Sequence, residues 1–476
     1  MSKPPMIGID FGTSKTCISV FQNGKVDIIL NEMNERTTPS CVAFNEKEKL
    51  VGNAANYQIK RNPTDTLFNI KRLLGVQFED KFIQQNMKYW PFEVVKDLSS
   101  GLAQVQITFK GEKKKYFIEE ILAMELQHIK KVASNYYGKE VKDAIIGVPN
   151  SFNSSQRQML RDAGLISGLN IYFAIGESTL ASLEYQLNKN DNAKENVVVF
   201  DLGAGFLNIS ILTLEEGLLE VKSVGGLSGL GGDDFDNRLI EYCANQFLKK
   251  TSKDIMQNPK ALARLRIECE KAKKILSSAT KATIELEGIM NGEDFYIEIT
   301  REKFEDLCTD YFKKIIPCLE TLLKEADMKK NQIDQIILTG GSSRIPKIQS
   351  MITDFFDGKQ LNKSLNLEES VSCGAAIRAA ICTNVNNEKV EKLILLDVSP
   401  FSIGFETVGG VMDVMVPKNS TIPCKKTKNF STYADNQSSI LVQLYEGERQ
   451  LTKDNHFIGK MVFDGLPPGP REKNGI

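Results

Sequence analysis

Two segments of the chain place an aspartate before a glycine turn in the same way. Residues 6–20 read MIGIDFGTSKTCISV, and residues 197–212 read VVVFDLGAGFLNISIL. Each apolar, strand-like run ends in an aspartate, Asp10 or Asp201, and glycine follows two positions later. Glycine lets the backbone approach a phosphate closely, successive N–H groups bind anions, and a strand-end aspartate can hold Mg²⁺ directly or through water. The pair therefore predicts two loops that clamp a triphosphate and its metal from opposite sides.

The first loop also carries hydroxyl donors. Thr13 and Ser14 directly follow Gly12, so side-chain and backbone donors could meet the same anion. A single loop of this kind is more often an ordinary strand turn. The repetition of the design is what favours phosphate binding.

A third segment could hold the base or sugar of a nucleotide. Residues 336–346 read IILTGGSSRIP, in which a strand-like run ends at Gly340 and Gly341 and a helix is expected from Pro346. The glycines could lie flat against a nucleobase or ribose, and Arg344 could stack on an adenine face. A plain turn with an exposed arginine explains the same residues equally well.

A fourth element is a long charged helix predicted over 259–277. Glu270, Lys273 and Ser277 would share one face of it, with Lys274 beside them. An acid, a base and a hydroxyl in a row suit ribose hydroxyls and a base edge. Taken alone, the face is more typical of a solvated, salt-bridged helix surface.

The elements around these motifs indicate an α/β core followed by a β unit. Apolar residues recur at helical spacing over 118–137 and 234–250, the second with Asp233 as its expected N-cap. Strands that alternate with such helices imply a sheet core. Near residue 384 the pattern changes to a polar, loop-like stretch, and 401–464 reads as a small antiparallel β unit.

Composition narrows the class of protein. The chain has 476 residues, too many for one hydrophobic core, and a net charge of −1 with acids and bases interleaved. That balance argues against a nucleic-acid or anionic-membrane surface. The nine cysteines have no zinc or redox spacing and are expected to be buried free thiols in a reducing compartment. No run is long enough to span a bilayer, so a cytoplasmic location is expected, with nuclear access left open.

Taken together and in this order, the motifs resemble the heat-shock protein 70 chaperone family from residue 2 to about 470. The matching phrases are RTTPS (36–40), KRLLG (71–75), VPNSFNSSQRQ (148–158), LGGDDFDNR (230–238), TGGSSRIPKIQ (339–349), LILLDVSPFSIG (393–404) and YEGERQLTKDN (445–455).

The resemblance implies a fold. An actin-like (ribonuclease H-like) duplicated ATPase domain would cover 1–385, with four subdomains around a deep cleft. An apolar linker would follow at 386–398, then a β-sandwich for extended apolar peptides at 399–466, shorter than in the family, and a flexible tail at 467–476. In the family, the linker and β domain dock on the ATPase domain when ATP is bound.

The resemblance also implies roles for particular residues. Asp10, Glu177 and Asp201 would organise Mg²⁺, largely through water, with K⁺ as a further candidate ion, and Lys71 would position the attacking water. The phosphate-binding residues would be Gly12, Thr13, Ser14, Gly203, Ala204 and Gly205. The nucleoside-binding residues would be Glu270, Lys273, Lys274, Ser277, Gly340, Gly341, Ser342 and Arg344. The peptide groove would include Val408, Phe430, Tyr433 and Ile440, for which plain β-core positions are an equal alternative.

Several positions depart from the family pattern. The second loop reads DLGAGFLN where the family has DLGGGTFD. Ala204 is expected to crowd a loop that favours positive φ, Phe206 removes a hydroxyl donor, and Asn208 removes a carboxylate. We therefore expect ATP binding to be retained and hydrolysis to be slowed. Four other positions also differ: Lys15, Ser178, Lys274 and Lys392.

Two functions remain open at this point. The first is an ATP-dependent chaperone that binds unfolded polypeptides and works with J-domain co-chaperones and nucleotide exchange factors. The second is a nucleotide-binding regulator that binds co-chaperones without holding clients. A sugar kinase or a filament-forming actin relative would share the core, but neither requires the LILLDV run and the β unit behind it.

Overall fold

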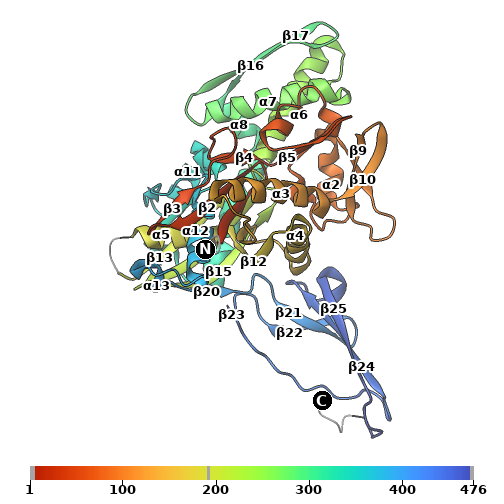
Figure 1. Ribbon diagram of the computed structural model, residues 1–476, viewed down its shortest axis with the longest axis vertical. Coiled ribbons are helices and arrows are strands. Elements are labelled where there is room, and N and C mark those ends of the chain that lie inside the picture. The colour runs from red at the N-terminus through yellow and green to blue at the C-terminus, as the bar shows by residue number, and fades with distance from the viewer. Residues whose placement is uncertain (1–5, 190–192, 472–476) are drawn as a thin grey trace.

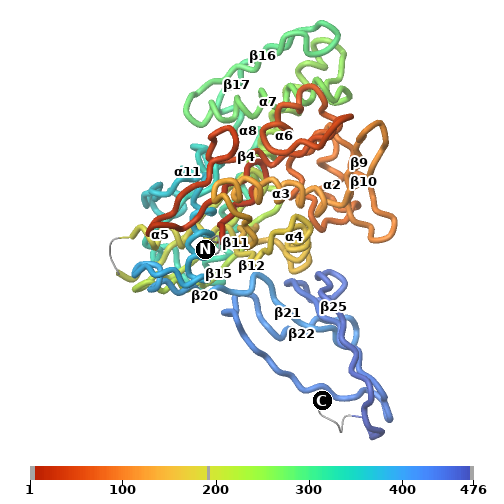
Figure 2. The backbone as a smooth tube through the Cα atoms, viewed as in Figure 1, coloured from red at the N-terminus to blue at the C-terminus, as the bar shows by residue number. Residues whose placement is uncertain are grey.

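The computed structural model describes residues 6–189 and 193–471. A large α/β part contains most of the chain, and a smaller β unit from the C-terminal segment extends from one side of it (Figure 1). The tube trace shows the chain passing through β20 before it enters this unit (Figure 2). Within the described residues, no helix is both long enough and apolar enough to cross a membrane.

The first half of the α/β part is built on a six-stranded sheet. Its order is β12-β11-β1-β2-β3, with β4 also paired to β2. β1 and β2 form an antiparallel hairpin, and β11 runs parallel to β1. The bounds are β1 Ile7–Phe11, β2 Lys15–Gln22, β3 Lys25–Ile28, β4 Thr37–Pro39, β11 Asp143–Val148 and β12 Asn170–Gly176.

The second half repeats this pairing in a seven-stranded sheet of order β19-β18-β13-β14-β15-β20-β23. β13 and β14 form an antiparallel hairpin, and β18 runs parallel to β13. The predicted duplication is therefore present in the strand topology. The bounds are β13 Glu195–Leu202, β14 Phe206–Glu215, β15 Leu218–Ser228, β18 Gln335–Thr339, β19 Leu361–Asn362, β20 Ile394–Val398 and β23 Thr421–Ile422.

Two helices join the halves. α5 (Glu177–Asn188) packs on β13, α12 (Ser370–Cys382) packs on β1, and the helices pack on each other. Their contact is close at Gly374, where a Cβ would lie 1.8 Å from the carbonyl oxygen of Leu180. Any larger residue at 374 would separate the helices and shift the sheets that they carry.

Helices and small sheets surround the first sheet. α3 (Ile118–Tyr137) coincides with its predicted range, and α4 (Ser154–Ser167) begins with Asn153 as N-cap. The small sheets are β6-β5-β7 and β10-β9-β8. Their bounds are β5 Cys41–Phe44, β6 Lys49–Val51, β7 Thr66–Phe68, β8 Glu93–Lys96, β9 Ala103–Phe109 and β10 Glu112–Phe117; the short helices α1 Asn53–Asn56 and α2 Lys81–Asn86 lie between them in sequence.

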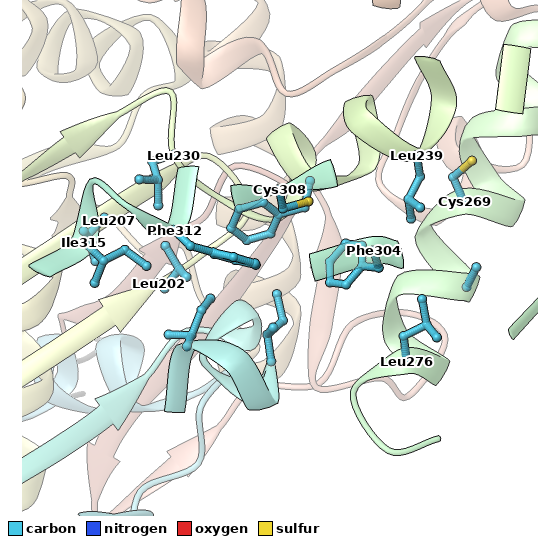
Figure 3. Packing of buried hydrophobic residues seen from close by; sticks show 14 of the residues in the cluster. Leu202, Leu207, Leu230, Leu239, Cys269, Leu276, Phe304, Cys308, Phe312 and Ile315 are labelled. Carbon is cyan, nitrogen blue, oxygen red and sulfur yellow. The ribbon is translucent and has the colours of Figure 1, made fainter. Parts of the chain in front are cut away.

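The second half has its own helical layer and hairpin over a large apolar core. Figure 3 shows side chains from the sheet, among them Leu202 and Leu207, and from the helices, among them Leu239 and Phe304, within this core. The bounds are α6 Gly232–Thr251, α7 Pro259–Leu276, β16 Lys281–Met290, β17 Glu293–Thr300, α8 Arg301–Leu307, α9 Thr309–Phe312, α10 Ile315–Glu325 and α11 Pro346–Phe355.

The predicted N-cap of α6 was wrong. Asp233 lies in the first turn of the helix, and Gly231 is the N-cap. The backbone N–H groups of Gly232 and Asp233 donate to the carbonyl oxygens of Gly203 and Ala204, at 3.0 and 2.8 Å. These loop carbonyls do what a capping side chain usually does, so α6 begins earlier than its own sequence suggests.

The segment expected to be an interdomain linker is not a free loop. α13 (Glu388–Glu391) is a short helix capped by Asn387, so the polar, loop-like prediction was wrong there. β20 then pairs parallel to β15 and antiparallel to β23. Most of the apolar run at 393–398, from Ile394 onward, is thus an integral strand of the second sheet.

The C-terminal β unit is one antiparallel sheet of order β22-β21-β24-β25. Apart from β23, which belongs to the second sheet, these are the strands that follow residue 398 in the described part of the chain, and a second layer of a sandwich is not among them. Residues 423–438 have no helix or strand, and Figure 2 shows this stretch arching away from the sheet. The bounds are β21 Ile403–Thr407, β22 Val411–Val416, β24 Ser439–Glu446 and β25 His456–Asp464.

Two further expectations concern the cysteines and the C-terminal tail. All nine cysteines are free, but Cys318 and Cys382 are only partly buried and Cys424 is exposed, so the expectation of buried thiols holds at the other six. Of the expected tail, residues 467–471 contain no helix or strand, and 472–476 lie outside the described residues.

Candidate functional site

A cavity of about 850 Å³ lies between the two halves of the α/β part. Both glycine loops, the 336–346 segment and the C-terminal half of α7 contribute to its wall. Every residue predicted to bind the nucleotide or its metal lines this cavity: Asp10, Gly12, Thr13, Ser14, Lys71, Glu177, Asp201, Gly203, Ala204, Gly205, Glu270, Lys273, Lys274, Ser277, Gly340, Gly341, Ser342 and Arg344.

The two loops differ in how tightly they are built. A Cβ on Gly12 would lie 2.2 Å from the carbonyl oxygen of Lys15, so only glycine fits the first loop at that point. A Cβ on Gly203, by contrast, would make only an ordinary contact of 3.9 Å with the carbonyl oxygen of Phe206. Ala204 does not have a positive φ, so the predicted crowding by its methyl group was wrong. The second loop accepts alanine because its backbone is in a region open to any residue.

Lys71 is held at the floor of the cavity. Its side chain is 3% exposed, and its Nζ donates to the carbonyl oxygen of Phe11 at 2.6 Å and to Glu177 Oε1 at 2.8 Å. These two bonds fix the ammonium group beside the first loop. A buried, fixed cation of this kind can stabilise negative charge that develops on a phosphate.

Phe206 lies next to this lysine. Its ring centroid is 5.5 Å from Lys71 Nζ, and it packs edge-to-face against Phe152 at 5.7 Å. The aromatic ring is 6% exposed and belongs to the apolar core of the first half. Phe206 therefore brings an apolar surface, without a hydroxyl donor, to the wall near Lys71.

The three acidic residues of the predicted metal site repel one another. Burial, followed by the nearby Glu177 carboxylate, raises the pKa of Asp10 well above its usual range, and Lys71 lowers it only in part. The same two causes, in the same order, raise the pKa of Asp201 to about 7. Their carboxylates therefore favour a cation, which would stabilise their ionised forms.

The geometry fits magnesium held partly by water and phosphate. Among residues 6–189 and 193–471, no three His, Cys, Asp or Glu side chains gather closely enough to hold a metal by themselves. Mg²⁺ usually keeps several waters and takes one or two carboxylates together with substrate phosphates. Asp10, Glu177 and Asp201 are suited to that arrangement, in which the ion would neutralise phosphate charge.

On the predicted nucleoside side of the cavity, polar side chains are held by hydrogen bonds and ion pairs. Lys273 Nζ donates to Asp236 at 2.6 Å and to the carbonyl oxygen of Gly232 at 2.9 Å. Lys274 forms an ion pair of 2.5 Å with Glu270 along α7. Ser342 donates to the carbonyl oxygen of Gly203 at 2.8 Å, which ties the 336–346 segment to the second phosphate loop.

Comparison with known proteins gives one consistent match. The family model described as Hsp70 protein matches residues 6–476. Heat shock cognate 70 kDa protein 3 of Dictyostelium discoideum is 47% identical over 98% of this chain and 74% of its own length. Heat shock 70 kDa protein of Neurospora crassa is 47% identical over 98% and 72%, and heat shock 70 kDa protein 2 of Paracoccidioides lutzii is 46% identical over 98% and 71%.

The chain belongs to the Hsp70 family. Family membership implies an actin-like ATPase fold with a site for ATP or ADP and Mg²⁺. The duplicated sheets and the cavity between them agree with that fold.

Some residues of this Hsp70 family member's cavity were missed by sequence reasoning. Asp233 and Asp236 line the cavity, and each has a buried carboxylate oxygen without a hydrogen-bond partner. Burial is the main cause that raises the pKa of Asp236, to about 6, and the nearby Lys273 ammonium partly opposes this rise. The sequence shows this run of aspartates, LGGDDFDNR, but it suggested only a family signature and, for Asp233, a helix N-cap. One oxygen of Asp233 and one of Asp236 could therefore accept hydrogen bonds from a polar ligand in the cavity.

A buried acid that interacts electrostatically with Lys71 was also missed. Glu125 of α3 is 5% exposed, and burial raises its pKa to about 8, although Lys71 lowers it. Its helical spacing from Leu122 and Ile129 places Glu125 on the apolar face of the predicted helix, and this was the signal that could have found it.

The four residues predicted to line a peptide groove differ in how far they are exposed. Val408 and Tyr433 are 95% and 79% exposed. Phe430 packs against Phe405 with ring centroids 4.8 Å apart, and Ile440 is half-buried in β24. Two of the four therefore project into solvent, and one contributes to the apolar face of the sheet.

Proposed function

We propose that this chain is an Hsp70-type chaperone that binds ATP with Mg²⁺ and uses it to control the binding and release of unfolded polypeptides. The observation that carries the proposal is the convergence of both glycine loops, Lys71 and the α7 residues on one cavity. Phosphoryl transfer needs mainly positioning and charge stabilisation, which these groups can supply. A calorimetric titration with Mg²⁺ and ATP that gave no binding heat would remove this basis.

The contacts between the two parts of the molecule support control by nucleotide. Glu446 of β24 accepts hydrogen bonds from the backbone N–H and the hydroxyl of Ser154, at 2.6 and 2.7 Å, at the start of α4. Lys418 pairs with Glu325 of α10 at 2.8 Å. These contacts are polar, and β20 belongs to the second sheet, which forms one side of the cleft. A shift of the halves around a nucleotide could therefore be transmitted to the β unit.

We further propose that hydrolysis is slow relative to the family pattern. Phe206 presents a ring where the pattern has a threonine hydroxyl, and Asn208 presents an amide where it has a carboxylate. Both positions lie within the network around Lys71 and Asp201. Loss of one transition-state donor in such a site costs about 2.7–4 kcal/mol.

The double variant Phe206→Thr/Asn208→Asp is expected to hydrolyse bound ATP roughly ten- to a thousandfold faster than the parent, because it restores a donor and a charge near the phosphates. Single-turnover hydrolysis with excess Mg²⁺ measures this. Phe206→Leu, which stays apolar and adds no hydroxyl, is the control and should remain slow. Equal rates in the parent and the double variant would contradict the proposed slowing.

A second candidate function is a nucleotide-binding regulator that associates with J-domain co-chaperones or exchange factors but holds no clients. Two observations favour it. Val408 and Tyr433 project into solvent, and the described part of the C-terminal β unit is a single four-stranded sheet. Under either function we expect such co-chaperones as partners and a cytoplasmic location, with nuclear access as a further proposal.

Fluorescence anisotropy of a labelled, extended apolar peptide separates the two functions. Chaperone activity predicts binding that weakens when ADP is replaced by ATP. Tyr433→Asp should reduce the binding, whereas Tyr296→Asp, at an exposed position on β17, should not. Intact ATP binding with no peptide binding in either nucleotide would favour the regulator instead.

A further inference from the structure

The amide group of Asn208 stands between two of the three carboxylates in the cleft. Its Nδ2 donates to Glu177 Oε2 at 2.6 Å and to Asp201 Oδ2 at 2.8 Å. The side chain is 1% exposed. Both hydrogens of the amide are therefore used, each on a carboxylate oxygen.

The orientation of this amide is determined by a third contact. The backbone N–H of Asn150 donates to Asn208 Oδ1 at 2.9 Å. A backbone N–H can only donate, so the atom that it meets must be the oxygen, and the NH₂ group must face the acids. Exchanging oxygen and nitrogen would break all three hydrogen bonds at once.

The same contacts connect the two halves of the α/β part. Asn208 and Asp201 lie on β14 and β13 of the second sheet, whereas Glu177 begins α5 and Asn150 follows β11 of the first. The side chain of Asn150 also donates to the carbonyl oxygens of Ile209 and Gly225, at 3.0 and 3.1 Å. Asn208 is therefore the middle of a polar bridge across the cleft floor.

A carboxylate could not make these contacts unaided. With aspartate at 208, an oxygen atom would replace the Nδ2 that now lies 2.6 and 2.8 Å from oxygens of Glu177 and Asp201. Like charges at such distances require a proton or a cation between them. The neutral amide supplies two hydrogens there and removes that requirement.

We propose that Asn208 is a positioning residue that holds Glu177 and Asp201 across the cleft floor without a bound cation. The bridge is thus assembled before magnesium and nucleotide arrive, and its closure is independent of ions. This inference rests on the proposed function for the later arrival of Mg²⁺. Its test contains no nucleotide, so the two proposals can fail separately.

The test is thermal unfolding of the full chain without nucleotide, in a chelator and in millimolar Mg²⁺ or K⁺. In the parent, Mg²⁺ or K⁺ should raise the Tm only slightly, through the attraction of Asp10 and Asp201 for a cation, because the Asn208 amide already joins Glu177 to Asp201. Asn208→Asp should lower the Tm in chelator by about 3 °C or more, and either cation should restore at least half of that loss. A purely structural defect would not respond to the cation.

Two control variants keep the result interpretable. Asn208→Ala removes the bridge without adding a third carboxylate, so its Tm should fall, and a cation should restore a smaller share of the loss than in Asn208→Asp. Asn237→Asp alters another buried amide, which contacts Asn86 and Arg266 rather than acids, and should be insensitive to cations. The proposal is overturned if the parent itself needs a cation for its Tm, a measurement that does not depend on any variant folding. It is equally overturned if Asn208→Asp loses the same amount with and without the ion.

Discussion

Replacing Lys71 with methionine is expected to reduce single-turnover ATP hydrolysis by roughly a hundred- to a thousandfold, the cost of losing one buried charged donor. Nucleotide affinity should change less than tenfold, because Lys71 bonds to Phe11 and Glu177 at the cavity floor and not to the α7 side. Rapid-quench hydrolysis measures the first quantity, and calorimetry with Mg²⁺ and ADP measures the second.

A lysine on the rim of the same cavity provides the matched control. Lys60 lines the cavity but is exposed, so Lys60→Met should leave the hydrolysis rate close to that of the parent. Comparable losses in both variants would mean that the rate responds to general charge in the cleft. An unchanged rate in Lys71→Met would remove the role assigned to this residue.

Replacing Arg72 with methionine is expected to lower the free energy of unfolding by about 3–5 kcal/mol, because it leaves a buried carboxylate without its partner. Arg72 Nη2 donates to both carboxylate oxygens of Asp234, at 2.8 and 3.0 Å, and the two side chains are 3% and 2% exposed. The guanidinium also lies over the Phe82 ring at 4.5 Å. The expected measurement is a drop of several degrees in the Tm of the nucleotide-free chain.

A solvent-exposed ion pair that also involves α6 serves as the comparison for the buried pair. Lys88 and Glu241 are joined at 2.9 Å with side chains 53% and 39% exposed, so Lys88→Met should cost at most about 1 kcal/mol. The double variant Arg72→Met/Asp234→Leu should recover most of the stability lost in the single variant, since no charge is then left unpaired. If the Arg72 and Lys88 variants lose equal stability, the buried pair is not the strong contact that we infer.

Much of the core could be predicted because its signals are local. The glycine loops after Asp10 and Asp201 are marked by their own neighbours, and the helices at 118–137 and 259–277 have apolar spacing and, for α7, a proline at the first position. The residues that the sequence assigned to the nucleotide site also lie together, around one cavity. Duplicated strand–loop–strand units put equivalent loops at the same edge of equivalent sheets.

Other features depended on partners far away in the sequence. The start of α6 is set by carbonyl oxygens of the second phosphate loop, which the helix sequence does not contain. The run at 393–398 is a strand because β15, at 218–228, offers it an edge. The consequence of Ala204 depended on a backbone angle, and an alanine in the sequence does not reveal that angle.

The amino-acid sequence by itself determined the family, the duplicated α/β core and the residues that line the cavity, because each is encoded in short runs with distinctive residue types. Only the tertiary structure decided what Phe206 and Asn208 do. From the sequence, these two residues indicate only the loss of a hydroxyl and of a charge. In the structure, the Phe206 ring packs beside Lys71, and the Asn208 amide joins Glu177 to Asp201. The reason is physical: the effect of a buried polar or apolar group depends on which atoms lie within a few ångströms of it, and those atoms come from distant parts of the chain.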